Sequence, residues 1–85
     1  MKRIPTKIAV ESICYHINGF QRIAIYDYEN IYDLWNHENG TLKCEGAFGD
    51  IKTLDYWKLF ASEVHGITAE DDTIIFHICT NFEQY

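Results

Sequence analysis

The pair Asn18-Gly19 is the strongest local signal for how this chain folds. It lies between two runs rich in β-forming residues, 7–17 and 20–28. A two-residue hairpin turn needs positive φ at both central positions, and Asn and Gly tolerate that conformation best. The pair therefore predicts a β-hairpin. Apolar side chains fall on both of its faces, so we expect either that both faces are at least partly covered or that the hairpin carries a bulge near Glu11-Ser12.

Residues 31–46 predict a second hairpin that turns at 37–40, with Gly40 in the left-handed position. The alternative is a short helix that begins at Asp27 or Asn30, buries apolar side chains on one face and ends at Gly40. The abundance of β-forming residues in this short segment favours the hairpin.

A helix is predicted over residues 53–65, because apolar side chains recur there at helical spacing and Thr53 is placed to cap its start. An acidic turn at 69–72 then leads into a last strand, 73–82. In the alternative, the helix ends early and residues 62–68 form a strand that pairs with the last one across this turn. The core face of the last strand should carry Ile74, Phe76, Ile78 and Phe82.

These elements predict an α+β fold. We expect a small antiparallel β-sheet of about four to six strands with one helix packed on it, in the order ββββαβ. The 85 residues form a single domain, 1–85, because a chain of this length has no room for two cores. Residues 1–6 are expected to form a loose N-terminal arm.

Cysteine usage and hydropathy predict a reduced, cytoplasmic compartment. Three cysteines are an odd number, and the chain opens without an apolar stretch of signal-peptide length. No apolar run reaches the roughly 18 residues that span a bilayer. We therefore expect neither a disulfide framework nor a membrane partner.

Charge is unevenly distributed along the chain, whose net charge is −6. The first 22 residues carry four basic groups and one acidic group, a net of +3, and the remaining 63 carry three basic and twelve acidic groups, a net of −9. A negatively charged surface repels nucleic acid and anionic membranes and attracts basic proteins.

Many of the carboxylates lie beside aromatic residues, most densely in 26–35. Tyr and Trp are enriched among the energetic anchors of protein interfaces, and carboxylates around them would pair with Arg or Lys of a partner. The alternative is that the aromatics form the core while the acids lie on a solvated sheet edge. The predicted partner-binding residues are Tyr26, Asp27, Tyr28, Glu29, Tyr32, Asp33 and Trp35.

Two mirror-image pairs, Cys14 with His16 and His77 with Cys79, suggest a metal site. If their strands were antiparallel neighbours, the four groups would form a Cys2His2 set suited to zinc. Residues two apart on a strand converge poorly on one ion, however, and structural zinc is usually held by ligands in turns. The alternative is that the cysteines are small buried hydrophobes and the histidines lie at a sheet margin.

No catalytic or cofactor-binding motif is present, so we expect a non-enzymatic protein. Gly46-Ala-Phe-Gly49 is similar in spacing to the backbone-clamping loop of KH domains, but Glu45 and Asp50 beside it would repel a nucleic acid. In size, acidity and absence of catalytic motifs, the chain resembles the class of small inhibitors that phages and mobile elements direct against nucleic-acid-binding defence enzymes. That resemblance implies a basic protein partner, which this protein would bind as an inhibitor or as a nucleic-acid decoy. The alternative function is a self-associating domain, a homodimer whose aromatics are buried between copies.

Overall fold

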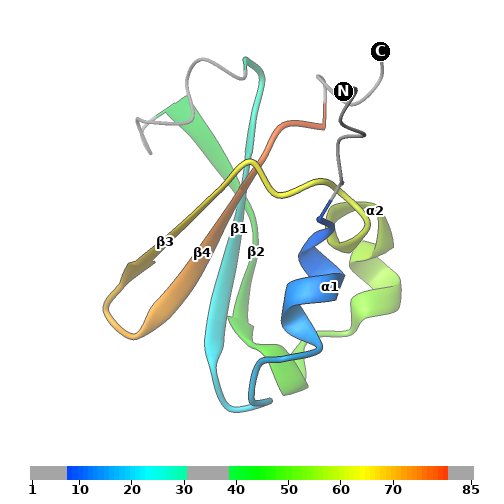
Figure 1. Cartoon of the computed structure of the whole chain (residues 1–85), viewed down its shortest axis with the longest axis vertical. Coiled ribbons are helices and arrows are strands. Elements are labelled where there is room, and N and C mark those ends of the chain that lie inside the picture. Colours follow the sequence, from blue (N-terminus) through cyan, green and yellow to red (C-terminus); the bar gives the residue numbers. More distant parts are fainter. Residues whose placement is uncertain (1–7, 31–38, 81–85) are drawn as a thin grey trace, which may run out of the picture.

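The computed structural model describes residues 8–30 and 39–80, and the elements below lie within these ranges (Figure 1). In chain order they are α1 (Val10–Cys14), β1 (Arg22–Tyr28), β2 (Gly40–Ala47), the 3-10 turns η3 (Phe48–Asp50) and η4 (Thr53–Tyr56), α2 (Trp57–Phe60), β3 (Gly66–Glu70) and β4 (Thr73–Ile78).

The four strands form one mixed sheet in the order β2-β1-β4-β3. β1 pairs with β2 and β4 pairs with β3 in antiparallel fashion, whereas the central strands β1 and β4 run parallel. The α+β class is therefore confirmed. The purely antiparallel sheet and the order ββββαβ are wrong, because a helix precedes the first strand and a parallel pair forms the centre.

The predicted first hairpin is absent, and residues 10–14 form α1 instead of a strand. Val10 and Cys14 lie four residues apart, so a helix brings both onto one buried face. Asn18-Gly19 connects α1 to β1, and neither residue has positive φ. The Asn18 side chain accepts a hydrogen bond from the Phe20 amide at 2.8 Å, which stabilises this connection.

The hairpin turn with positive φ lies instead at Asp71-Asp72, between β3 and β4, where φ is 50° and 62°. Glu70 pairs with Thr73 across it, so the loop has two residues. The alternative prediction for this part of the chain is confirmed in that the helix ends early and a strand after it pairs with the last one. That strand is β3, residues 66–70, rather than the predicted 62–68.

The predicted helix 53–65 is wrong in extent, because η4 and α2 end at Phe60. Beyond this point the chain is drawn into an extended pairing with the segment before α1. The Val10 amide donates to the Ser62 carbonyl and the Val64 amide donates to the Ile8 carbonyl, at 3.0 and 2.8 Å. These bonds need extended backbone, which ends the helix.

The second predicted hairpin lies partly outside the described residues, as do half of its turn at 37–40 and most of the alternative helix that was to end at Gly40. That helix does not begin at Asp27, because Asp27 lies in β1. The second strand of the predicted hairpin is β2, which pairs with β1 so that Gly40 faces Tyr28. Gly40 does not adopt the left-handed conformation predicted for it.

The core lies between the sheet and the two helices, which both pack on the same face (Figure 1). Ile74, Phe76 and Ile78 face this core as predicted, and Phe82 lies outside the described residues. Buried core side chains come from both layers: Val10, Cys14, Ile23, Ile25, Cys44, Phe60, Phe76 and Ile78.

The alternating residues of the sheet point the other way, toward a face that neither described helix covers. We call this the open face. It carries Ala24, Tyr26 and Tyr28 of β1, Ile75 and His77 of β4, and their register partners on β2 and β3.

Candidate functional site

The predicted acidic-aromatic run does not form one surface in the part that the structure describes. Tyr26 is half-buried on the open face, and Tyr28 is 1% exposed. Asp27 and Glu29 line a depression at the end of β1 together with Tyr28, whereas Tyr26 lines a different one. Predicted positions outside the described residues are Tyr32, Asp33 and Trp35.

Asp27 has a structural role that the sequence does not reveal. Its carboxylate accepts hydrogen bonds from the Thr80 amide and the Thr80 hydroxyl, at 3.0 and 2.8 Å. This ties the chain after β4 to the end of β1. The adjacent depression, about 680 Å3, also contains Lys43, so its charge is mixed.

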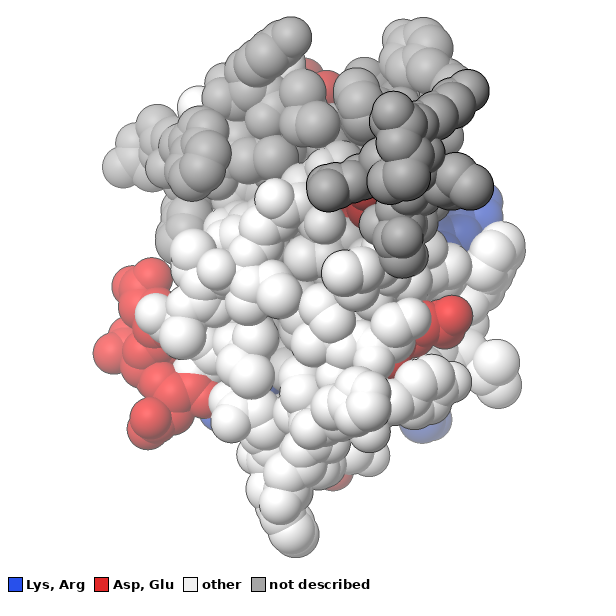
Figure 2. Space-filling view, in the orientation of Figure 1, with Lys and Arg blue, Asp and Glu red and all other residues white. Residues whose placement is uncertain are grey.

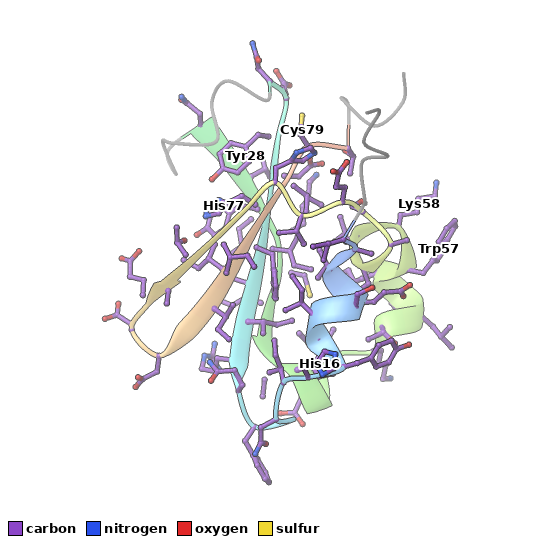
Figure 3. The ribbon with its side chains drawn as sticks, in the orientation of Figure 1. His16, Tyr28, Trp57, Lys58, His77 and Cys79 are labelled. Carbon is purple, nitrogen blue, oxygen red and sulfur yellow. The ribbon has the colours of Figure 1, made fainter. Side chains whose placement is uncertain are left out.

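A hydrogen-bond network joins three strands of the sheet, with Tyr28 and His77 buried and Thr68 exposed. Figure 3 shows Tyr28 and His77 close together. The Tyr28 hydroxyl lies 2.8 Å from Nδ1 of His77, and the Thr68 hydroxyl lies 2.9 Å from Nε2 of the same ring. His77 is 2% exposed. A neutral imidazole donates at one nitrogen and accepts at the other, and hydroxyl partners suit both roles.

The network has consequences for chemistry. Burial raises the pKa of the Tyr28 hydroxyl, and nearby Tyr26 raises it further, so this hydroxyl stays protonated at neutral pH. Both ring nitrogens of His77 are engaged, so neither is free to serve as a base or a metal ligand in this arrangement. The network links the strands and explains why β4 has a buried histidine among its isoleucine and phenylalanine residues.

The Tyr28 ring packs directly against Gly40 at the start of β2. This close contact leads to a stability prediction. A Cβ atom on Gly40 would lie 2.6 Å from Cζ of Tyr28, whose hydroxyl is held by His77. We expect Gly40→Ala to lower the free energy of unfolding by about 1–3 kcal/mol in urea denaturation. Gly19→Ala is the control, since its Cβ would find no heavy atom nearer than 3.6 Å. Equal denaturation midpoints for the two variants would contradict this packing.

The structure does not assemble the predicted zinc ligands. Cys14 lies in α1, so the strand pairing on which the prediction depended is wrong. In Figure 3, His16 lies in the lower part of the view, away from His77 and Cys79 in the upper part. Within residues 8–30 and 39–80, no three His, Cys, Asp or Glu side chains are grouped to hold a metal. Cys14 and Cys79 are fully buried, in agreement with the alternative that they act as small hydrophobes.

The open face carries a second depression, of about 290 Å3, which we call the acidic depression. Ala24 and Ile75 are adjacent across β1 and β4 and provide an apolar floor. Carboxylates stand on both sides of it. The lining residues are Ala24, Tyr26, Glu45, Glu70, Asp71, Thr73 and Ile75.

Sheet register explains this arrangement. Glu45 of β2 lies opposite Ala24, and Glu70 of β3 lies opposite Thr73, so the two carboxylates flank the central strands. Asp71 adds a third at the hairpin turn. Figure 2 shows acidic side chains gathered at this turn, on the left of the view. Arg22 lies beside Thr73 in the register, so one basic group adjoins the depression.

Sequence reasoning found Tyr26 but missed its companions. Glu45, Glu70 and Asp71 are 19 to 45 positions away in the chain, and only the pairing of β2, β1, β4 and β3 brings them to one place. No local pattern in the sequence signals that grouping.

No helix in the described residues is long and apolar enough to cross a membrane. Comparisons of the chain with models of known protein families, with curated proteins and with solved structures found no match.

Proposed function

We propose that the protein is a non-enzymatic binding protein whose acidic depression receives a basic side chain of a partner protein. The observation that carries this proposal is the combination of an apolar floor, the Tyr26 ring and carboxylates on two sides of one depression. A nucleic-acid-binding enzyme is a suitable partner, because its basic surface would complement the −9 charge of residues 23–85.

Arginine and lysine side chains are amphipathic, and the depression matches both parts of them. The aliphatic stem can lie on Ala24 and Ile75 while the charged head meets carboxylate oxygens. A guanidinium can also stack on the ring of Tyr26. At about 290 Å3, the depression suits one side chain better than a large cofactor.

A charge-matched pair of variants tests this proposal. The probe is a fluorescent tetra-arginine peptide, with its neutral citrulline counterpart as the ligand control. We expect Glu45→Gln/Asp71→Asn to weaken arginine-peptide binding by about tenfold at low salt, since two charge-assisted contacts are lost. Asp50→Asn/Asp55→Asn has the same net charge but changes exposed residues of η3 and η4, and should alter binding by less than about twofold.

Two results would contradict the proposal. Equal weakening by both double variants would mean that only net charge attracts the peptide, and equal affinity for the citrulline peptide would mean that charge is not recognised. Neutralising the adjacent base with Arg22→Gln should strengthen binding, because a competing cation is removed.

Self-association is the second candidate function, and exposed apolar side chains on both edge strands favour it. Leu42 of β2 and Ile67 of β3 are both exposed. Sedimentation velocity at micromolar concentration separates the two candidates, because a strict monomer leaves only the binding of another protein.

A further inference from the structure

The helical layer has its own depression, on the far side of the core from the open face. It lies between α1 and the η4–α2 segment and measures about 290 Å3. Four aromatic side chains line it, from Tyr15, Phe48, Trp57 and Phe60. Among its described lining residues, Glu11 is the one with a charge. We call it the aromatic depression.

The aromatic rings come from separate elements and are unequally exposed. Phe60 is buried, and its ring centroid lies 6.1 Å from that of Phe48 at an interplanar angle of 49°, so the two rings meet at an angle. Tyr15, just after α1, is 79% exposed and Trp57, at the start of α2, is 61% exposed. Large aromatics left in water beside one hollow indicate a binding surface.

A second observation concerns Trp57: one of the rings that line the depression already has a cation beside it, although Lys58 itself is not part of the lining. The Nζ atom of Lys58 lies 5.7 Å from the centroid of the Trp57 ring, within the range of a cation–π interaction (Figure 3). The chain thus already places an ammonium group over one of the rings that line the depression. The carboxylate of Glu11 adds a full negative charge to the same lining.

We propose that the aromatic depression binds a methylated ammonium group. Aromatic faces attract a cation without accepting ordinary hydrogen bonds, whereas an unmethylated ammonium has three N–H donors to satisfy. Methyl groups remove those donors and spread the charge over apolar surface that packs against rings. One carboxylate then supplies the counter-charge. The source of the group is either a free choline-type molecule or a methylated lysine of a protein.

Titration of the full chain by two-dimensional NMR tests the proposal, with choline as the probe and 3,3-dimethyl-1-butanol as its neutral isostere. We expect choline to shift the signals of Tyr15 and Trp57, and to bind roughly ten times more tightly than the neutral alcohol at fixed ionic strength. Equal affinity for the two, or no shift at these residues with choline, would overturn the proposal.

Three variants add independent readouts. Glu11→Gln and Tyr15→Leu should each weaken choline binding by roughly three- to tenfold, and both positions are exposed, so the fold should survive the change. Lys58→Met should strengthen it by roughly two- to fivefold, because the intramolecular cation no longer competes for Trp57. Unchanged choline affinity in all three variants would reject the site.

A trimethyllysine peptide compared with choline distinguishes the sources, and the unmethylated peptide is the control for the methyl groups. Tighter binding of the methylated peptide than of choline assigns the site to a protein partner, and the reverse assigns it to a free small molecule. Glu11 and Tyr15 do not line the acidic depression. A negative choline result would therefore not contradict the proposed arginine-binding function, and a negative arginine-peptide result would not contradict choline binding.

Discussion

Replacing His77 with alanine is expected to lower the free energy of unfolding by about 3 kcal/mol. The change leaves the hydroxyl of Tyr28, which is buried, without its partner and opens a cavity in the central strand. An unsatisfied buried polar group costs about 1–3 kcal/mol, and loss of packed side-chain volume adds to that. Urea denaturation monitored by circular dichroism measures the effect.

His16→Ala is the matched control, because His16 is exposed and should contribute less than about 0.5 kcal/mol. Tyr28→Phe removes one hydroxyl from the same network and should cost about 1–2 kcal/mol. A double-mutant cycle over Tyr28 and His77 should then give a coupling energy of about 1 kcal/mol or more. If His77→Ala costs no more than His16→Ala, the network does not stabilise the sheet.

The second large effect is a loss of stability at alkaline pH that originates in the core thiol of Cys14. Burial, with a smaller contribution from neighbouring Cys44, raises the pKa of this thiol from 9.0 to about 11. The unfolded chain therefore releases this proton at lower pH than the folded protein does. The stabilising contribution is complete below pH 9 and is lost as pH rises through about 11, by about 3 kcal/mol in total.

The Cys14→Ala variant isolates this contribution. Its stability at neutral pH will be lower, because a buried side chain is shortened, but its further loss between pH 8 and pH 10.5 should be about 2 kcal/mol smaller than that of the unmodified chain. Both proteins are denatured with urea under reducing conditions. Burial also raises the pKa values of Cys44 and Tyr28, and these groups are common to both proteins. Parallel pH profiles would show that the Cys14 thiol is not buried as described.

Local residue patterns were sufficient for part of this fold. The alternation of Ile74, Phe76 and Ile78 correctly identified the core face of β4, because one buried face imposes a period of two on any strand. The acidic segment before that strand correctly indicated a turn. Asp71 and Asp72 adopt positive φ there, which Asp tolerates better than most residues.

Residues 10–14 show where local patterns fail. Their β-forming side chains predict a strand, yet the segment is a helix because Val10 and Cys14 then pack together against the sheet. Its position is set by pairing with residues 62–64, some fifty positions away. A few tenths of a kcal/mol of local propensity is small beside the burial of two apolar side chains.

Local residue patterns and composition were enough to predict the α+β class, the net negative charge and the core face of the last strand. Three features could be seen only in the folded chain: the parallel pairing of β1 with β4, the burial of Tyr28 against His77, and the grouping of Glu45, Glu70 and Asp71 beside Tyr26. Each of these features joins segments that are far apart in the chain. Contacts of that kind depend on which apolar faces pack together, and no local spacing of residues records that choice.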